Sequence, residues 1–404
     1  MSFPSTSSGA DSGAPRTAAI DGLRSLLTLL VIAHHAVLAY FIYAPPLGKF
    51  DNTLYWAAFP VIDAAKAPGV DALVLWNDSF FMALLFLLSG LFVGPSLARK
   101  GAGRFLRDRL LRLGVPFAVG AALLAPLAYL PAYLQRGGTD GLAGFWAAWR
   151  QLDKWPAGPT WFLWVLLVFS ALAALGHALA PRLMAAWGRF GAWCGETPGR
   201  CLAVWAMAAL LAYVPVTLVV NPMQWAGWGP FFVQTSRVPF YAVYFALGVA
   251  LGARGGLASG LLAPGGGLAR RWIAWQSGAG VVFVAFVAVL IVTSIKASRG
   301  ENPAGWGLAT NALFSLTSVM TSLALLAYFA RRHSVESRFW AALRPNAFGM
   351  YVVHYAVVSW LQYALLGAAW PGLAKALVVT VAAIGLSWGL TEILRRLPGV
   401  RTIL

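Results

Sequence analysis

Long apolar runs alternate with short polar stretches along almost the whole chain. An α-helix needs about 20 largely apolar residues to cross a bilayer. About ten runs approach or exceed this length, and we expect helices near residues 18–42, 79–95, 115–133, 161–180, 202–220, 238–252, 272–295, 309–330, 347–367 and 373–394. The pattern predicts an all-α fold, a polytopic integral membrane protein with about ten transmembrane helices.

The even spread of these runs predicts one membrane domain, over residues 18–400, rather than several soluble domains. Residues 1–17 are rich in Ser, Gly and Pro and contain no apolar run, which is typical of a disordered tail. The first run continues to Tyr43 without a clear cleavage site for a signal peptidase. We therefore expect it to be a retained helix.

Composition excludes a soluble domain. Hydrophobic residues make up 60% of the 404 positions and charged residues only 11%, whereas soluble domains are nearer half apolar and a quarter charged. The net charge of +17 raises the possibility of a nucleic-acid partner. The basic residues, however, lie in short loops between apolar runs, so we expect a lipid bilayer as partner and no nucleic acid.

Basic residues are unequally divided between the two sets of loops. If the N-terminus is cytoplasmic, about two-thirds of the Lys and Arg residues fall in cytoplasmic segments. Cytoplasmic loops carry such an excess in membrane proteins. The sequence therefore predicts that both termini are cytoplasmic and that the protein is a multi-pass protein of the cell inner (plasma) membrane.

The first run, DGLRSLLTLLVIAHHAVLAY, carries ionisable residues at Arg24, His34 and His35. Such groups are costly at membrane depth, so they are candidates for function. Arg24 and His35 are eleven residues apart, which returns to nearly the same helix face about 16 Å further along. We expect Arg24 near the cytoplasmic mouth of a channel and His35 deeper, as a general base. The structural alternatives are snorkelling of Arg24 and a helix–helix hydrogen bond of His35.

Other motifs follow along the chain. Small residues in FLLSG (86–90) favour close helix packing. In RFLRDRLLRLGVP (104–116), Arg109 and Arg112 share a helix face and could bind phosphate, although a purely topogenic role is equally consistent with their position. The ninth run places His354 near Tyr351, so a second intramembrane histidine favours a polar cavity.

The predicted outer loop at 43–78 combines four acids with aromatic residues. Carboxylates accept hydrogen bonds from sugar hydroxyls and aromatic rings stack on sugar faces, so this loop suits carbohydrate. An interfacial aromatic belt with solvated acids is the alternative. The acids are Asp51, Asp63, Asp71 and Asp78.

Some motifs are absent from the sequence. Its two cysteines, Cys194 and Cys201, are too few and too close for a zinc site, and we expect no metal. The sequence contains no GxxxxGK[ST] loop, which argues against ATP hydrolysis by a P-loop protein.

Five motifs occur in a characteristic order: DGLR…HH, FLLSG at 86–90, RLLRLGVP at 109–116, WFL at 161–163 and NAFGMYVVH at 346–354. Through these motifs and their order, the chain resembles the membrane-bound acyltransferase family 3 over about residues 18–400. Members of that family acylate carbohydrates and other envelope molecules, typically from an acyl-CoA donor. The resemblance implies that His35 is the catalytic histidine, that Arg24 is its essential partner, and that Arg109 and Arg112 help to bind the donor. His34, His354 and Tyr351 are further candidates for the site.

Within the family, residues 231–252 (FFVQTSRVPFYAVYFALGVALG) are most similar to the glucans biosynthesis protein C branch, which is linked to succinylation of periplasmic glucans. Thr160 stands where that branch commonly has a histidine, which leaves the acyl group open.

The sequence thus predicts an O-acyltransferase that moves an acetyl or succinyl group from acyl-CoA to a hydroxyl of a carbohydrate, such as a glucan, or of another envelope acceptor. Acyl-CoA would be a donor substrate, and no bound cofactor is expected. The alternative is a transporter or flippase for a carbohydrate or lipid-linked substrate. No internal repeat is evident, which weakens the transporter hypothesis.

Overall fold

Helices make up nearly all the regular structure in the described part of the chain. The structure, a computed structural model, describes residues 15–51, 55–253, 261–263, 265–301, 303–332 and 337–404. The predicted tail at 1–17 lies largely outside these residues, and the first helix begins at Pro15. The helices are α1 (Pro15–Leu38), α2 (Tyr55–Ala58), α3 (Val70–Gly90), α4 (Val93–Arg109), α5 (Val115–Val119), α6 (Ala125–Gln135), α7 (Gly141–Arg150), α8 (Trp161–Leu179), α9 (Pro181–Gly195), α10 (Pro198–Thr217), α11 (Val238–Gly252), α13 (Gly267–Arg270), α14 (Trp272–Ser298), α15 (Ala304–Arg332), α16 (Arg338–Leu343), α17 (Ala347–Ala364), α18 (Gly372–Leu394) and α19 (Val400–Ile403).

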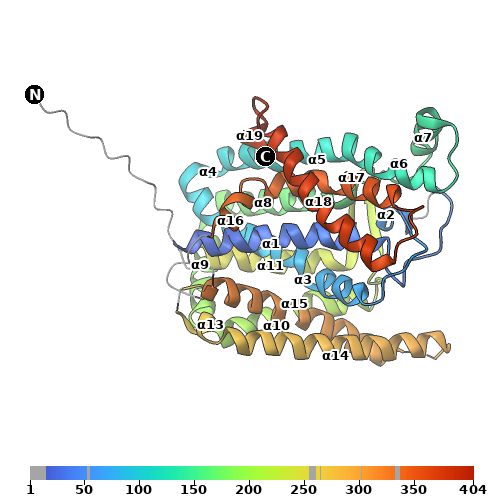
Figure 1. The fold of residues 1–404 in the computed structure, drawn as a ribbon. Helices are drawn as coiled ribbons and strands as arrows, with labels where there is room; N and C mark the ends of the chain where they lie inside the picture. The colour runs from blue at the N-terminus through green and yellow to red at the C-terminus, as the bar shows by residue number, and fades with distance from the viewer. Residues whose placement is uncertain (1–14, 52–54, 254–260, 264, 302, 333–336) are drawn as a thin grey trace, which may run out of the picture.

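The long helices lie side by side, most with their axes close to parallel (Figure 1). α1 is an inner helix that packs against α3, α15, α17 and α18. One end of the bundle holds the start of α1 together with α9, α13 and α16, and we call it the N-terminal face. The other end holds α2, α7 and a β-hairpin, and we call it the hairpin face.

Among the described residues, eight helical segments are long and apolar enough to cross a bilayer. Each of the ten predicted runs falls on a helix, and eight of them fall on these segments. The other two are α11, which has only 15 residues, and α17, which has 18 residues and carries His354, Ser359 and Gln362. The prediction of a helical membrane protein is confirmed, while the count of spanning helices by length and apolar content is eight.

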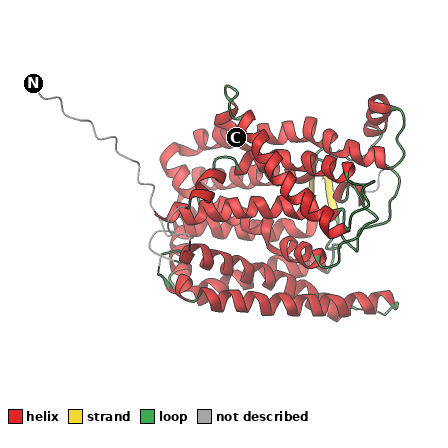
Figure 2. Ribbon diagram, in the orientation of Figure 1, coloured by secondary structure: helices red, strands yellow, loops and turns green. Residues whose placement is uncertain are grey.

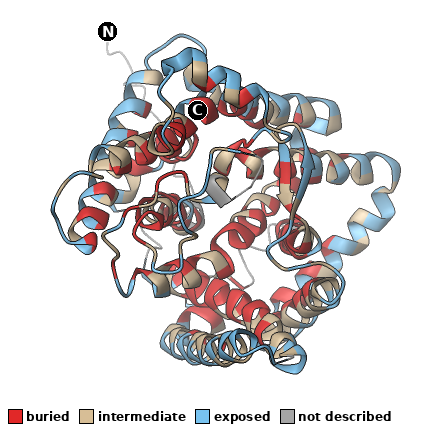
Figure 3. Cartoon of the chain, turned by 90° about the vertical axis from the view of Figure 1, so that its right-hand side faces the viewer, coloured by how far each residue is buried: buried red, intermediate tan, exposed pale blue. Residues whose placement is uncertain are grey.

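The outward faces of the peripheral helices are exposed and apolar. Figure 3 looks onto the hairpin face and shows buried residues toward the inside of the bundle and exposed residues around its rim. Exposed positions on these helices include Leu172 of α8, Val281 of α14 and Val381 of α18, the last two about 70% exposed. A surface of this kind is unfavourable in water and favourable against lipid tails.

Small residues let α3 and α11 approach closely. A Cβ atom on Gly90 would lie 2.3 Å from the carbonyl oxygen of Phe245, and one on Gly248 would lie 2.2 Å from that of Leu87. Only a hydrogen atom fits at these positions. The expectation that FLLSG serves close helix packing is therefore confirmed.

The loop between α1 and α3 is tied to the hairpin face by buried polar contacts. Lys375 Nζ lies 2.8 Å from Asp63 Oδ2, and both side chains are almost fully buried. Gln135 exchanges two hydrogen bonds with the backbone of Ile62, and Arg136 donates to the Pro60 carbonyl. Burial lowers the pKa of Arg136 to about 10, so it stays charged at neutral pH. Asp71, in the first turn of α3, also serves the fold, because it accepts a hydrogen bond from the backbone N–H of Ile42.

Two local features differ from the sequence prediction. Strands β1 (Trp225–Trp228) and β2 (Phe231–Gln234) form an antiparallel hairpin before α11 (Figure 2). Two π-helical segments, η1 (Leu110–Gly114) and η2 (Gly120–Leu124), interrupt the long helix that runs from α4 to α6. Neither feature has a hydropathy signal, because a short hairpin and a single wide helical turn keep the same apolar content.

We predict that Gly90→Ala lowers the stability of the folded protein. The added methyl group must displace the backbone of α11, and overpacking of this kind costs about 1–3 kcal/mol. Thermal unfolding in detergent would measure the change. Gly385→Ala, in α18, is the matched control because nothing lies within 4 Å of its Cβ position. Equal melting temperatures for the two variants would contradict the prediction.

Candidate functional site

Two histidines from distant parts of the chain meet inside the bundle. His35 of α1 and His354 of α17 have ring centroids 5.1 Å apart, and His354 Nε2 lies 3.2 Å from His35 Nδ1. His354 is fully buried, whereas His35 is partly exposed. The structure therefore brings together two of the histidines that the sequence marked as candidates.

Backbone carbonyl groups fix the proton positions on this pair. His354 Nδ1 lies 2.7 Å from the Tyr351 carbonyl oxygen, and His35 Nδ1 lies 2.8 Å from that of Val31. A carbonyl oxygen only accepts, so in neutral rings both Nδ1 atoms carry hydrogen and both Nε2 atoms carry a lone pair. His354 Nε2 then accepts from His35 Nδ1. Among the described residues, His35 Nε2 has no hydrogen-bond partner, so its lone pair remains available as a base.

Tyr355 and Gln362 support His35 but were not among the residues predicted from the sequence. The ring of Tyr355 stands edge-on to the His35 ring at 5.0 Å, and its hydroxyl donates to the Ala57 carbonyl at 3.0 Å. Gln362 donates to the backbone carbonyls of His35 and Ala36 at 2.8 and 3.0 Å. Tyr355 and Gln362 lie four and eleven residues after Tyr351, so the three side chains share one face of α17. This polar stripe on an apolar helix is the feature of the sequence that could have identified them.

A small cavity adjoins His354. Its lining comes from α17, from the π-helical turn η2 and from η3 (Gly158–Thr160), and the Tyr351 hydroxyl crosses it to donate to the Pro159 carbonyl. π-Helical turns occur frequently at functional sites because they redirect side chains and backbone groups. Thr160 occupies part of this region, packed within contact distance of Gly120. Its lining residues are Gly120, Leu124, Ala125, Ala157, Pro159, Thr160, Tyr351, Val352, His354 and Tyr355.

His34 lies on a different side of α1. Its ring is buried and packs against that of Phe81 on α3 at 5.0 Å. It also stands edge-on to the His35 ring at 5.3 Å. In the described part of the chain, its Nδ1 atom has no hydrogen-bond partner.

Three arginines converge toward the N-terminal face. Arg24 is exposed although it belongs to the inner helix α1, and its guanidinium lies 5.9 Å from the Phe92 ring. Arg109, at the end of α4, is within electrostatic range of Arg24 and of Arg112. Two acids of this region have basic partners of their own, Asp108 with Lys100 and Asp21 with Arg344. The surroundings of Arg24 therefore keep an excess of positive charge, as an anion site requires.

An ion pair that was not predicted from the sequence lies near His34. Arg237, directly before α11, donates from Nη1 to Asp78 Oδ1 at 2.9 Å and from Nη2 to Asp78 Oδ2. Asp78 is in the middle of α3, and its charge acts on His34. Asp78 could have been noticed as an acid within an apolar run, but its partner Arg237 is 159 positions away in the sequence.

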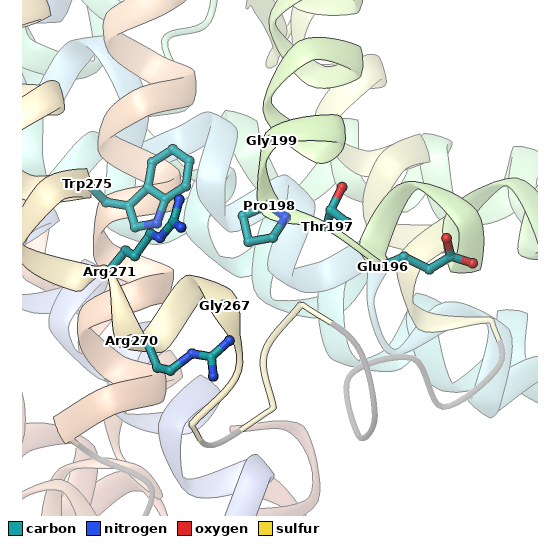
Figure 4. Close-up of a pocket in the computed structure, with 8 residues that line it drawn as sticks. All are labelled: Glu196, Thr197, Pro198, Gly199, Gly267, Arg270, Arg271 and Trp275. Atoms are coloured by element: carbon teal, nitrogen blue, oxygen red, sulfur yellow. The ribbon is translucent and has the colours of Figure 1, made fainter.

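A second hollow opens between the α9–α10 turn and the start of α14 (Figure 4). Arg271 and Trp275 lie together on one side of it, and Thr197 and Pro198 lie on the other. Basic and tryptophan side chains are common where helices meet the membrane surface. None of the predicted site residues lines this hollow. Within the described residues, no group of three His, Cys, Asp or Glu side chains could hold a metal ion.

Comparison with known proteins identifies the family. The sequence matches the acyltransferase domain family over residues 17–392, which is nearly the whole chain. The chain belongs to the acyltransferase 3 family. No curated protein and no solved structure matches it. This acyltransferase 3 protein is therefore a membrane acyltransferase that transfers groups other than aminoacyl groups.

The match includes every site element described above. Arg24, His35 and His354 all lie within the acyltransferase domain, as do Arg109 and Arg112. The two hydrogen-bonded histidines lie near opposite ends of the matched sequence, so their contact brings the first and last parts of the acyltransferase domain together.

We predict that Gln362→Met reduces acyltransferase activity more than it reduces stability. Methionine has a similar size but cannot donate to the carbonyls of His35 and Ala36, so the end of α1 loses its fixed position. Gln276→Met is the matched control, since Gln276 makes a comparable bond to the Ala324 carbonyl between α14 and α15. Melting temperature and acyl transfer would be measured for both. Equal losses of activity in the two variants would contradict a positioning role for Gln362.

Proposed function

We propose that this acyltransferase moves an acetyl or succinyl group from acyl-CoA to a hydroxyl of a carbohydrate or of another envelope acceptor. The observation that carries the proposal is the arrangement of His35. Its Nδ1 atom is held by the Val31 carbonyl and by His354, which leaves Nε2 unprotonated and without a partner among the described residues. A histidine held in this way suits a general base at neutral pH.

That geometry supports the following reaction. His35 Nε2 takes the proton of the acceptor hydroxyl as the oxygen attacks the thioester carbonyl of the donor. The positive charge on the His35 ring is stabilised by the Val31 carbonyl and by His354 Nε2, both of which accept from Nδ1–H. When the carbon–sulfur bond breaks, the proton passes from His35 Nε2 to the leaving sulfur. The products are the acylated acceptor and free CoA.

The arginine cluster supports a CoA donor. Guanidinium groups bind phosphate in a forked geometry, and CoA carries phosphates at one end and the acyl thioester at the other. Arg24 and His35 are about 16 Å apart along α1. The extended pantetheine arm of CoA suits a gap of this kind, with the phosphates at Arg24, Arg109 and Arg112 and the thioester at His35.

The distribution of basic residues supports a cytoplasmic N-terminal face. The three arginines lie toward this face, and about two-thirds of all Lys and Arg residues fall in its loops by the sequence prediction. Acyl-CoA would then enter from the cytoplasm across an inner membrane, while the hairpin face would receive the acceptor. Similarity of residues 231–252 to the glucans biosynthesis protein C branch supports succinyl as the group and a glucan as the acceptor.

We predict that His35→Ala lowers acyl transfer by at least about a hundredfold, because the base is removed. The assay is acceptor-dependent release of free thiol from acetyl-CoA and succinyl-CoA by protein in detergent, with a glucose oligosaccharide as acceptor. His354→Phe should cause a smaller loss, since the Val31 carbonyl still holds the ring. His177→Ala, at the end of α8, is the control and should retain activity. Full activity in a folded His35→Ala protein would disprove the proposal.

We predict that Arg112→Ala raises the KM for acyl-CoA by about tenfold, as expected for a lost charge-assisted hydrogen bond. The KM for the same acyl group on pantetheine should not change, because pantetheine lacks the nucleotide phosphates. Arg104→Ala removes the same charge from an exposed position of the same segment and serves as the control. An equal effect on both donors would contradict phosphate binding at Arg112.

A further inference from the structure

The ion pair between Asp78 and Arg237 is unequally buried. The Arg237 side chain is 6% exposed, whereas that of Asp78 is 39% exposed. The Asp63–Lys375 pair provides a comparison, with side chains 3% and 1% exposed. An ion pair that serves only to join two parts of the fold can be buried completely, as Asp63–Lys375 is. The exposure of Asp78 therefore indicates a second use.

Arg237 holds this carboxylate in a fixed position. Its Nη1 atom donates to Oδ1 at 2.9 Å and to the Asp78 carbonyl oxygen at 3.1 Å, and its guanidinium lies 4.9 Å from the Phe314 ring. An ionised carboxylate has about four acceptor positions, and Arg237 takes one on each oxygen. The remaining lone pairs of Asp78 are available to a ligand.

Asp78 lies on the opposite side of the histidines from the arginine cluster. α1 runs from the N-terminal face toward the hairpin face, so Arg24 precedes the level of His34 and His35. α3 runs the other way, and its Phe81 packs on the His34 ring. Asp78, one turn earlier in α3, is therefore displaced toward the hairpin face. A donor bound at Arg24 and a ligand bound at Asp78 would approach His35 from opposite directions.

The chemistry of this place suits hydroxyl groups. A fixed carboxylate accepts hydrogen bonds from hydroxyls and repels anions. Aromatic rings lie nearby, since Trp161 is half-buried and stacks on Tyr241 at 5.6 Å, and Tyr241 is within electrostatic range of Asp78 and Arg237. A carboxylate beside aromatic surface is suited to a neutral, polyhydroxylated molecule.

We propose that Asp78, held by Arg237, binds hydroxyl groups of the acceptor and orients the molecule so that one further hydroxyl reaches His35 Nε2. The proposal rests on the acyltransferase function above and assigns its acceptor site to the hairpin-face side of His35. Asp78 is then an acceptor-binding residue, and Arg237 is a positioning residue that acts through it.

The first test is a comparison of Michaelis constants. In Asp78→Asn, the KM for a glucose oligosaccharide should rise at least tenfold, while the KM for acyl-CoA and the acceptor-independent hydrolysis of the thioester should not change. Asp78→Glu keeps the charge but moves it, and should give a smaller rise with the same selectivity. An unchanged acceptor KM, or equal losses for donor and acceptor, in a folded variant would overturn the proposal.

Two controls separate acceptor binding from general destabilisation. Asp71→Asn removes a negative charge from the same helix, and asparagine can still accept from Ile42. Asp63→Asn weakens the buried pair with Lys375 and should lower the melting temperature. Both should keep the wild-type KM for the acceptor. A comparable rise in acceptor KM in either control would assign the effect of Asp78→Asn to the fold and overturn the proposal.

Direct binding distinguishes this proposal from the acyltransferase chemistry. Oligosaccharide binding to wild type and to Asp78→Asn would be followed by calorimetry without donor. Binding that weakens at least tenfold in the variant supports the acceptor site even if wild type transfers no acyl group, in which case the proposed reaction fails alone. Transfer by wild type with equal oligosaccharide affinity in the two proteins would overturn the site and leave the reaction standing.

Discussion

The hydrogen bond between His35 and His354 is the interaction on which the arrangement of the site depends. It joins α1 to α17 across 319 positions of sequence, and each ring is also tied to a carbonyl of its own helix. A histidine side chain could turn in an open cavity, and either nitrogen could then carry the proton. Here the ring orientation and the proton position are set by backbone groups that cannot move without unwinding a helix. Gln362 adds a further link between the same two helices at the level of His35.

This polar interior is compatible with a membrane only because the rest of the protein isolates it. The outward surfaces of α8, α14 and α18 are apolar, and the charged residues of the inner helices discussed above are either paired or exposed. Asp78 pairs with Arg237, and Asp63 pairs with Lys375, because an unpaired buried charge is strongly unfavourable. Arg24 is exposed instead, although it belongs to an inner helix. Its charge therefore lies where water and anions can reach it.

The fold class and the main helices could be predicted from the sequence because they depend on local apolar content. The separation of Arg24 and His35 followed from helix geometry, and the convergence of Arg24, Arg109 and Arg112 is what their proposed shared role requires. The pairs Asp78–Arg237 and Asp63–Lys375 could not be predicted, since nothing in a single sequence specifies which distant helices touch. Tyr355 and Gln362 could have been predicted, because they form a polar stripe on the apolar helix α17. The π-helical turns and the hairpin could not, because each depends on the tertiary structure around it.

The short length of α11 has a consequence for how the bundle crosses the membrane. Fifteen residues of helix span about 22 Å, which is less than the hydrocarbon thickness of about 30 Å. α11 alone is therefore too short to cross the hydrocarbon layer, and Arg237 and the β-hairpin, which come directly before it, continue the chain toward the hairpin face. Non-helical chain inside a bundle of this kind must pair its backbone groups or keep them in contact with water. The antiparallel pairing of β1 with β2 meets part of that requirement, so this part of the bundle is completed without a full spanning helix.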